Sequence, residues 1–372
     1  MSITGKVVLD LPPVKGNPRN SEGSFINLKD GRIMFVYSKF TGDRFNDDAS
    51  ADLAARYSDD NGETWTDDRI IATREEDHAL NIMSVTLMRM ANGDIGLFYV
   101  IRAGANDART YLRRSADEGE IWSVPLLCIQ PVGYYVVNND RVIRLSDGRL
   151  LIPAAFHRNG YDSGNKNPGI RFDSRGEVIF FISDDDGKTW TEGNCKSVLP
   201  FNAYSYSGLQ EPGVVELGNG MLWSFARTDM CYQYEMFSFD RGETWTTPQP
   251  SRFTSPCSPM SIKRIPETGN LLAVWNPVPN YNGSQQFRKG AWNGGRTPFV
   301  LSVSKDDGRT WADMTVLEDD PNHGYCYCAI HFTKDAVLLG YCAGGPEDGC
   351  CLSKLRVRKI PLSSIQRADD NE

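Results

Sequence analysis

Long hydrophobic runs are missing from this 372-residue sequence. No run of 18 apolar residues exists, so no transmembrane helix is predicted. The first residues, MSITGKVVLDLPPVKG, also lack the basic start, apolar stretch and small-residue cleavage site of a secretory signal peptide. We therefore expect a cytoplasmic protein without a membrane partner, unless a leader has been removed from its start.

Positive charge is in short supply. The chain has 40 Lys and Arg against 48 Asp and Glu, which gives a formal net charge of −8. This acidic balance argues against a nucleic acid or an anionic membrane as partner. A hydrophobic content of 40% with 24% charged residues is that of a soluble globular protein rather than a disordered chain.

Paired cysteine motifs are also absent. The nine cysteines are an odd number at irregular spacing, so neither a disulfide framework nor an oxidising compartment is expected. The C-terminal part does gather five cysteines and two histidines, but no CxxC pairs with matching spacing occur among them. We predict no metal and no cofactor. The five C-terminal cysteines are Cys326, Cys328, Cys342, Cys350 and Cys351, and the two histidines are His323 and His331.

What the sequence does contain is a repeated octet of the form S-x-D-x-G-x-x-W. Its five copies span residues 58–65, 115–122, 183–190, 238–245 and 304–311. The Asp is expected to accept backbone N–H groups two residues on, the Gly to supply a positive φ, and the Trp to begin the next strand. Each octet is thus a predicted hairpin turn, and the spacing of about 60 residues divides the chain into six units.

A second repeat gives the same number. An apolar strand, a polar turn and another apolar strand recur at residues 24–38, 84–100, 141–156, 213–227, 261–276 and 329–342. With no helical periodicity between them, six units of four strands predict an all-β fold, a six-bladed β-propeller of four-stranded antiparallel blades. Residues 4–11 are expected to complete the last blade against residues 355–358, and the lack of a linker predicts one domain over 1–372.

The positions for chemistry follow from this architecture. The octets are interpreted as structural turns on the rim, whereas the innermost strand of each blade lines the channel. Counting back eight residues from each inner turn gives one mouth position per blade. These positions are Glu22, Ser84, Asn139, Glu211, Met260 and Tyr327, with Asn81, Asn138, Asp140 and Arg141 beside them. A buried charge is costly unless it is paired, so this cluster is predicted to be functional, although Asp140 and Arg141 could also form a structural ion pair.

At this point the sequence resembles the sialidase (neuraminidase) superfamily with Asp-box, or BNR, repeats, over nearly the whole chain. The resemblance implies a tyrosine nucleophile polarised by a glutamate, an aspartate as acid/base, and three arginines that hold a substrate carboxylate. Such a tyrosine is a known exception to the use of two carboxylates by glycosidases. Because the boxes also occur in propellers with other functions, activity has to be argued from the site.

The resemblance assigns the catalytic residues by motif. Leu209-Gln210-Glu211-Pro212-Gly213 looks like the segment with the catalytic glutamate, which is Glu211 here. The sixth unit begins Gly324-Tyr325-Cys326-Tyr327, and counting favours Tyr327 as nucleophile with Tyr325 as the alternative. The acid/base aspartate falls in residues 47–52, where we choose Asp48 and hold Asp47 in reserve.

Two of the three arginines match the family pattern and one does not. Arg227 ends the strand that Glu211 opens, and Arg296 precedes the fifth octet, as expected of the second and third arginines. The family's R-I-P before the first inner strand is replaced by Pro18-Arg19-Asn20-Ser21-Glu22, so Ser21 takes the aligned position and Arg19 comes two residues early. A replacement could also come from Arg44, Arg102 or Arg141.

The sequence therefore predicts an exo-glycoside hydrolase that releases a terminal acidic sugar, sialic acid or a related one, from an acidic oligosaccharide with retention. The alternatives are a polysaccharide lyase or non-sialic glycosidase, or a glycan-binding propeller without catalysis. The lyase draws on His157, which is either a substrate contact or a rim residue. The predicted substrate-binding residues are Arg227, Arg296, Arg19, Glu22, Asp140, Arg141 and His157.

Overall fold

The computed structural model describes residues 4–161, 170–200, 202–277 and 295–366. Within these residues the fold is all-β, as predicted, and its helical parts are a 3-10 turn, η1 (Pro346–Asp348), and one short helix, α1 (Leu362–Gln366). No helix among the described residues has the length and apolar character needed to cross a bilayer.

Four sheets have four strands each, all paired antiparallel. The first contains β2 (Asn20–Asn27), β3 (Ile33–Phe40), β4 (Ala51–Ser58) and β5 (Arg69–Ala72). The second contains β15 (Gln210–Glu216), β16 (Leu222–Arg227), β17 (Tyr232–Ser238) and β18 (Gln249–Thr254). The third contains β19 (Ser261–Arg264), β20 (Leu271–Trp275), β21 (Phe299–Ser304) and β22 (Thr315–Glu318). The fourth has the order β1 (Lys6–Leu11), β25 (Leu355–Pro361), β24 (Ala336–Cys342) and β23 (Cys326–Phe332), so the first strand of the chain pairs with the last.

The remaining strands form one sheet of nine rather than two separate sheets of four. Its path runs β14 (Thr191–Ser197), β13 (Ile170–Ser183), β12 (Leu150–Tyr161), β10 (Tyr134–Val136), β8 (Asp107–Ser115), β7 (Ile95–Gly104) and β6 (Asn81–Arg89). Two short strands lie off this path, β9 (Leu126–Leu127) beside β8 and β11 (Ile143–Arg144) beside β12. The two halves are joined by one parallel pairing of β10 with β8, at Tyr134 and Ala108. The sequence repeat did not anticipate this bridge, because β10 lies outside the repeated motifs.

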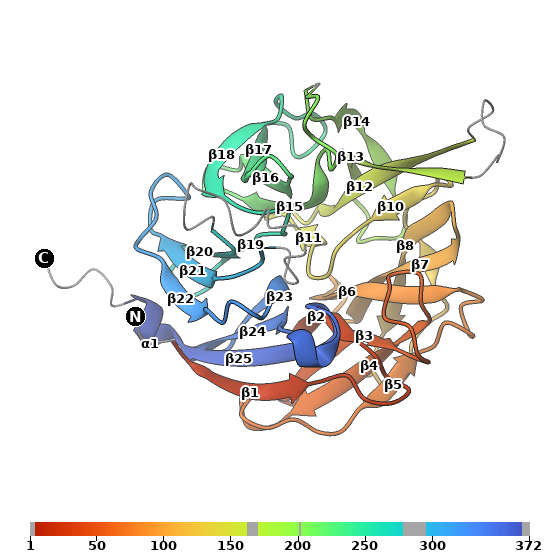
Figure 1. Cartoon of the computed structure of the whole chain (residues 1–372), viewed down its shortest axis with the longest axis vertical. Helices are drawn as coiled ribbons and strands as arrows, with labels where there is room; N and C mark the ends of the chain where they lie inside the picture. The colour runs from red at the N-terminus through yellow and green to blue at the C-terminus, as the bar shows by residue number, and fades with distance from the viewer. Residues whose placement is uncertain (1–3, 162–169, 201, 278–294, 367–372) are drawn as a thin grey trace, which may run out of the picture.

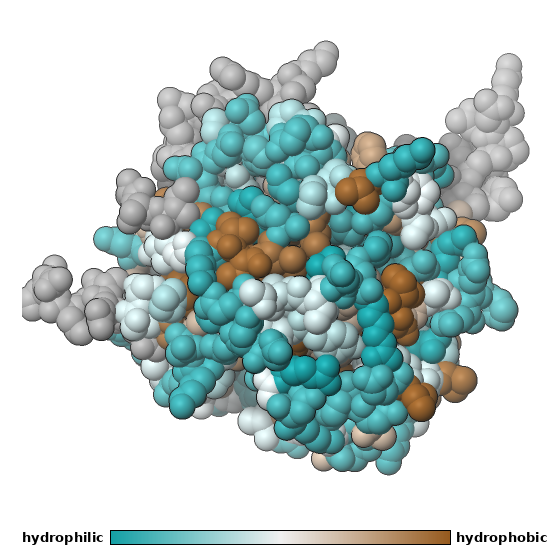
Figure 2. All heavy atoms as spheres, turned by 90° about the horizontal axis from the view of Figure 1, so that it is seen from below, coloured by the Kyte–Doolittle hydropathy of each residue, from teal (hydrophilic) through white to brown (hydrophobic). Residues whose placement is uncertain are grey.

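The sheets are arranged in a ring. Figure 1 shows β2, β6, β15, β19 and β23 near its centre and β5, β14, β18 and β22 towards its outside. Neighbouring sheets pack face to face, as where Met34 and Val36 of β3 share a buried cluster with Leu97 and Tyr99 of β7. Burial of such side chains is the main source of stability in a fold without long helices. From the side, hydrophilic residues cover most of the surface, and hydrophobic residues form separate groups (Figure 2).

The octets are turns between the third and fourth strands of the units, and all five share one geometry. In the first, the Asp60 carboxylate accepts hydrogen bonds from the backbone N–H groups of Glu63 and Thr64, at 3.0 and 2.9 Å. The Asp60 carboxylate therefore accepts hydrogen bonds from the N–H groups three and four residues later in the chain, not two residues later as expected. The Gly has φ between 82° and 91° in every copy, in agreement with the prediction. The Trp precedes the next strand rather than beginning it, since β5 begins only at Arg69 after Trp65.

The inner strands carry the feature that positions the site. Pairing shifts register in β2, β6, β15 and β23, which marks a β-bulge in each. The residue at each bulge has a left-handed backbone. These residues are Glu22, Ser84, Glu211 and Tyr327, with φ of 55°, 63°, 49° and 58°. All four are predicted mouth positions. Non-glycine residues adopt this conformation at a cost, and such strain collects at functional sites.

Candidate functional site

Tyr327 and Glu211 meet at the centre of the ring. The Tyr327 hydroxyl donates a hydrogen bond to Glu211 Oε1 at 2.9 Å, although 116 residues separate the two in sequence. Both side chains are buried. Burial, and after it the Glu211 charge, raise the pKa of Tyr327 well above its usual value, so the ring remains a phenol. Tyr325, the alternative, instead stacks on Phe299.

Arg227 connects to both members of this pair. Its Nη1 lies 2.7 Å from Glu211 Oε2 and donates to the Tyr327 hydroxyl at 3.2 Å. Nε and Nη2 donate to Gln210 Oε1 at 3.0 and 2.7 Å, which fixes the plane of the guanidinium. The last residue of β16 thereby orients the first two residues of β15.

Arg19 lies two residues before the position where the family pattern expects its first arginine. It lies just before β2, is 1% exposed and stacks on the Phe40 ring at 4.4 Å. Its Nη1 contacts Asp47 Oδ1 at 2.6 Å and its Nη2 contacts Glu22 Oε1 at 3.1 Å. Ser21, which stands at the family's arginine position, accepts a hydrogen bond from Arg19 Nε at 3.0 Å. Of the alternatives, Arg44 pairs with Asp48, Arg141 donates to the Met260 carbonyl, and Arg102 Nη1 donates to the Asp47 carbonyl at 3.1 Å.

Arg296 approaches from the opposite side of Tyr327. Its guanidinium carbon lies 5.5 Å from the centre of the Tyr327 ring. Nη1 donates to Cys326 Sγ at 3.1 Å and Nη2 to the Cys257 carbonyl at 3.4 Å. The charges of Arg19, Arg227 and Arg296 each lower the pKa of Asp47, so all three guanidiniums lie in the space around this carboxylate.

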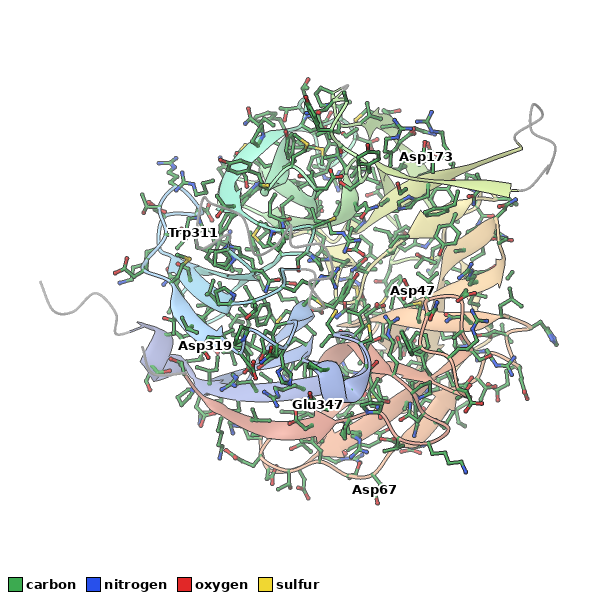
Figure 3. All side chains as sticks on the ribbon, viewed as in Figure 1. Asp47, Asp67, Asp173, Trp311, Asp319 and Glu347 are labelled. Carbon is green, nitrogen blue, oxygen red and sulfur yellow. The ribbon has the colours of Figure 1, made fainter. Side chains whose placement is uncertain are left out.

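Asp47, the reserve choice, occupies this space and Asp48 does not. Against the effect of desolvation, the charge and hydrogen bond of Arg19 hold the pKa of Asp47 below its usual value. Asp48 is exposed and pairs with Arg44 at 2.6 Å. Asp47, and not Asp48, is therefore the aspartate that contacts Arg19, although its side chain is itself 65% exposed. Figure 3 shows Asp47 towards the centre, while Asp67 and Trp311 lie near the outer edge.

Glu22 is a third acidic group in the same space. Its Oε2 accepts a hydrogen bond from Ser84 Oγ at 2.6 Å, and its Oε1 contacts Arg19. Burial raises the pKa of Glu22 to about 7 even though Arg19 acts in the other direction. This carboxyl group therefore changes charge near neutral pH.

Three predicted binding residues lie elsewhere or have structural partners. Asp140 pairs with Lys263 at 2.6 Å rather than with its neighbour Arg141. Arg141 is buried, donates to the Met260 carbonyl at 2.6 Å and lies over the Phe225 ring, so the Asp140–Arg141 pair expected as the structural alternative does not form.

His157 is the third of these residues. Its ring stacks on Phe172, and Nδ1 contacts the Asp173 carbonyl at 3.0 Å. It is buried and belongs to an aromatic group with Tyr134.

A cavity opens beside the cluster. Its wall includes residues that the sequence analysis named and others that it missed. They are Glu22, Asp47, Asn81, Ser84, Arg102, Asn138, Glu211 and Tyr327 from the first group, and Met83, Val100, Ala108, Tyr134, Tyr135, Val136 and Val137 from the second. Tyr134 lies on β10, outside both repeats, so no sequence signal marked it.

Possible metal ligands lie away from this cavity. Among the described residues, one group of three brings together His323, Glu347 and Asp348. The Lys354 ammonium lies 2.9 Å from Asp348 and 3.5 Å from Glu347, so a protein cation already neutralises the group. The cysteines of the C-terminal part are free thiols.

Comparison with known proteins agrees with this picture. Residues 40–340 match the family model of the BNR repeat-like domain. A sialidase of Bacteroides fragilis is 26% identical over 63% of this chain, and one of Paraclostridium sordellii is 24% identical over 70%. The chain spans only 39% and 67% of the lengths of these two relatives. A solved structure of a Hadza microbial sialidase superposes with a TM-score of 0.70 at 17% identity, over 94% of this chain and 67% of that one. The protein therefore belongs to the BNR-repeat family of the sialidase superfamily.

Proposed function

We propose that this protein is a sialidase-like exo-glycoside hydrolase that releases a terminal acidic sugar, sialic acid or a related sugar, from a glycan. The observation that carries the proposal is the Tyr327–Glu211 hydrogen bond of 2.9 Å, with Arg227 in contact with both residues and with Arg19 and Arg296 near enough to lower the pKa of Asp47. The family membership and the two sialidase relatives support the reaction class.

The arginines give the expected orientation of the substrate. Planar guanidiniums bind carboxylates through paired hydrogen bonds, so Arg19, Arg227 and Arg296 would hold the carboxylate of an acidic sugar. In sialic acid this carboxylate is attached to the anomeric carbon. The anomeric carbon is thereby placed over the Tyr327 hydroxyl, which Arg227 contacts directly.

Tyr327 and Glu211 then act as one nucleophile. The phenol is neutral and approaches a carbon that bears a carboxylate with less repulsion than a carboxylate nucleophile would meet. As the oxygen of Tyr327 bonds to the anomeric carbon, its proton passes to Glu211 Oε1, and the glycosidic bond breaks as its leaving oxygen takes a proton from the acid/base aspartate. Hydrolysis of the tyrosyl-linked sugar by water completes a retaining reaction.

Asp47 is the proposed acid/base, and its ion pair with Arg19 links its protonation to substrate binding. Its side chain is 65% exposed and can leave Arg19 when a ligand carboxylate takes its place. Loss of the guanidinium partner returns the pKa of Asp47 towards its usual value, which favours donation of a proton to the leaving oxygen. Substrate binding and acid activation are thereby coupled through Arg19.

We further propose that the ring consists of six four-stranded units. The nine-stranded sheet divides at its one parallel pairing, between Tyr134 and Ala108, into a group of four strands (β6 to β9) and a group of five (β10 to β14), in which β10 is an addition to the four-stranded unit. Six copies of the strand–turn–strand repeat in the sequence support the same number.

The decisive experiment is hydrolysis of a fluorogenic sialoside. The wild-type protein is expected to release the sugar with retained configuration, as followed by NMR. Tyr327→Phe is expected to lower kcat on the order of 10³-fold or more. Tyr325→Phe is the matched control, because this ring stacks on Phe299 instead of contacting Glu211.

Three outcomes would redirect the proposal. No turnover of any sialoside by the wild type would sink the sialidase reaction and leave the fold intact. An unsaturated uronic product would indicate a lyase. Saturable glycan binding without product, unchanged in Glu211→Gln, would indicate a binding protein.

A further inference from the structure

Arg296 differs from the other two arginines in its partner. Arg19 contacts two carboxylates and Arg227 contacts Glu211. Among the residues that the structure describes, Arg296 forms no ion pair with a carboxylate. Its nearest acceptor is the sulfur of Cys326, at 3.1 Å from Nη1.

Cys326 is placed where a neutral thiol and an anionic thiolate differ strongly in energy. It is fully buried and stands opposite Cys342 in the pairing of β23 with β24. Both are free cysteines. Burial raises the pKa of the Cys128 thiol well above the usual range, even though the Arg114 charge acts in the other direction. For Cys326, burial acts in the same direction, but a hydrogen bond from Cys342 and the Arg296 charge lower the pKa.

We propose that Cys326 is a thiolate that serves as the counter-ion of Arg296 and positions this guanidinium against the Tyr327 ring. A guanidinium carries five N–H donors, and a single sulfur accepts few of them. A carboxylate partner would fork across two donors and compete with the carboxylate of a ligand. The thiolate thus accepts from Nη1 of Arg296 and leaves other N–H donors of this guanidinium for the ligand.

The titratable groups around Arg296 and Cys326 determine which group carries the negative charge. The other titratable groups that act on the pair include Tyr327, Cys342, Cys350, Cys351, Glu211, Asp47 and Arg227, and of these Glu211 raises the pKa of Cys326. Burial raises the pKa of Cys342 well above its usual value, so Cys342 remains a thiol and can donate to Cys326. Cys326 is a positioning residue in this arrangement, because it acts through Arg296.

Thiolate absorption in the far ultraviolet tests the charge directly and does not depend on enzymatic activity. The measurement is made in a Cys350→Ser background, because the pKa of Cys350 is itself lowered to about 6. At neutral pH the difference spectrum between this background and its Cys326→Ser variant should show one thiolate band. The band should vanish on denaturation and in Arg296→Met. Cys328→Ser is the matched control, because Cys328 lies two residues away, is equally buried and has a raised pKa.

Absence of the band in the folded background protein at neutral pH would overturn the proposal. If Cys326→Ser does not fold, comparison of the background protein with Arg296→Met gives the same decision. A band that persists in Arg296→Met would also overturn it, since Arg296 would not be what stabilises the anion.

A kinetic measurement tests the positioning role and rests on the proposed function. Cys326→Ser keeps the size of the side chain and removes the charge. KM for a sialoside should rise about tenfold, which corresponds to roughly 1.4 kcal/mol, while kcat changes much less. An unchanged KM with a reduced kcat would contradict the positioning role. If the wild type hydrolyses no sialoside, the proposed function fails but the spectroscopic test still decides the charge.

Discussion

Asp47 and Asp48 are adjacent in sequence but have different surroundings, and a substitution at each separates them. Asp47 contacts Arg19 inside the cluster, whereas Asp48 contacts Arg44 at the surface. Asp47→Asn should lower kcat by about 10²-fold or more, since a general acid is lost. Asp48→Asn should stay within about twofold of the wild type, because exposed ion pairs contribute little. Steady-state kinetics on the same sialoside measure both, and a larger loss in Asp48→Asn would restore the sequence-based choice.

Glu22 makes stability depend on pH in a direction unusual for a carboxyl group. Because burial raises its folded pKa to about 7, against an ordinary value of 4.5, the folded protein retains a proton that the unfolded chain releases. This contribution is complete below about pH 4.5 and is lost as the pH rises through about 7. Glu22→Gln keeps an uncharged polar group, so the variant should gain on the order of 3 kcal/mol relative to the wild type between these limits.

Denaturant unfolding of both proteins across this pH range measures the difference. Ser84→Ala is a useful companion, because it removes the hydroxyl that donates to the Glu22 carboxylate. Parallel stability profiles for wild type and Glu22→Gln would show that folding does not raise the pKa of Glu22.

At the scale of the element, the inner-strand bulge explains why a counting rule could locate residues of the site. A bulge with a left-handed residue turns one side chain towards the ring centre in several units, so residues at equal offsets from the inner turns converge. The rule gave Glu22, Ser84, Glu211 and Tyr327. In the third unit it gave Asn139, whereas the left-handed residue is Asp140, with φ of 60°. That unit has only a two-residue inner strand, β11, and hence no long ladder to fix its register.

The octet turns are elements whose contribution is to stability rather than to the site. Asp60 accepts hydrogen bonds from Ser58 Oγ, Thr64 Oγ1 and two backbone N–H groups, and these outweigh desolvation and lower its pKa to about 2. Asp60→Ala should therefore lower the free energy of unfolding by about 1–2 kcal/mol and leave kcat unchanged. Asp59→Ala, at the adjacent exposed position, is the control and should stay within about 0.5 kcal/mol.

Thermal and denaturant unfolding measure this pair of variants. Because the folded pKa is depressed, the contribution of Asp60 is present above about pH 4 and is lost as the pH falls through about 2. Equal stabilities of the two variants at neutral pH would mean that the hydrogen bonds of the octet are replaced by water without cost.

At the scale of the whole molecule, repeats were readable from the sequence and long-range partners were not. The octets and the strand–turn–strand motif are local, so they predicted the all-β class and the turn positions. The partners of Arg19 lie up to 28 positions from it in the sequence, beyond β2 and β3, and no pattern placed Asp47 above Asp48. The sulfur beside Arg296 was likewise unpredictable, because it depends on the meeting of two segments 30 residues apart.

Asp140 and Lys263 join distant parts of the chain at the centre of the ring, and their coupling tests whether that centre is a single unit. The Asp140 carboxylate contacts Lys263 Nζ at 2.6 Å and accepts hydrogen bonds from Ser24 Oγ at 3.2 Å and the Ile330 backbone N–H at 3.0 Å. Asp140→Asn and Lys263→Met should each lower the free energy of unfolding by about 2–3 kcal/mol, because each leaves a largely buried charge without its partner. The double variant should lose less than the sum by about 1 kcal/mol or more, as measured by a double-mutant cycle of denaturant unfolding. Additive losses would mean that the inner strands are held by their own sheets alone, whereas coupling shows that β2, β19 and β23 are fixed to one another behind the site that they share.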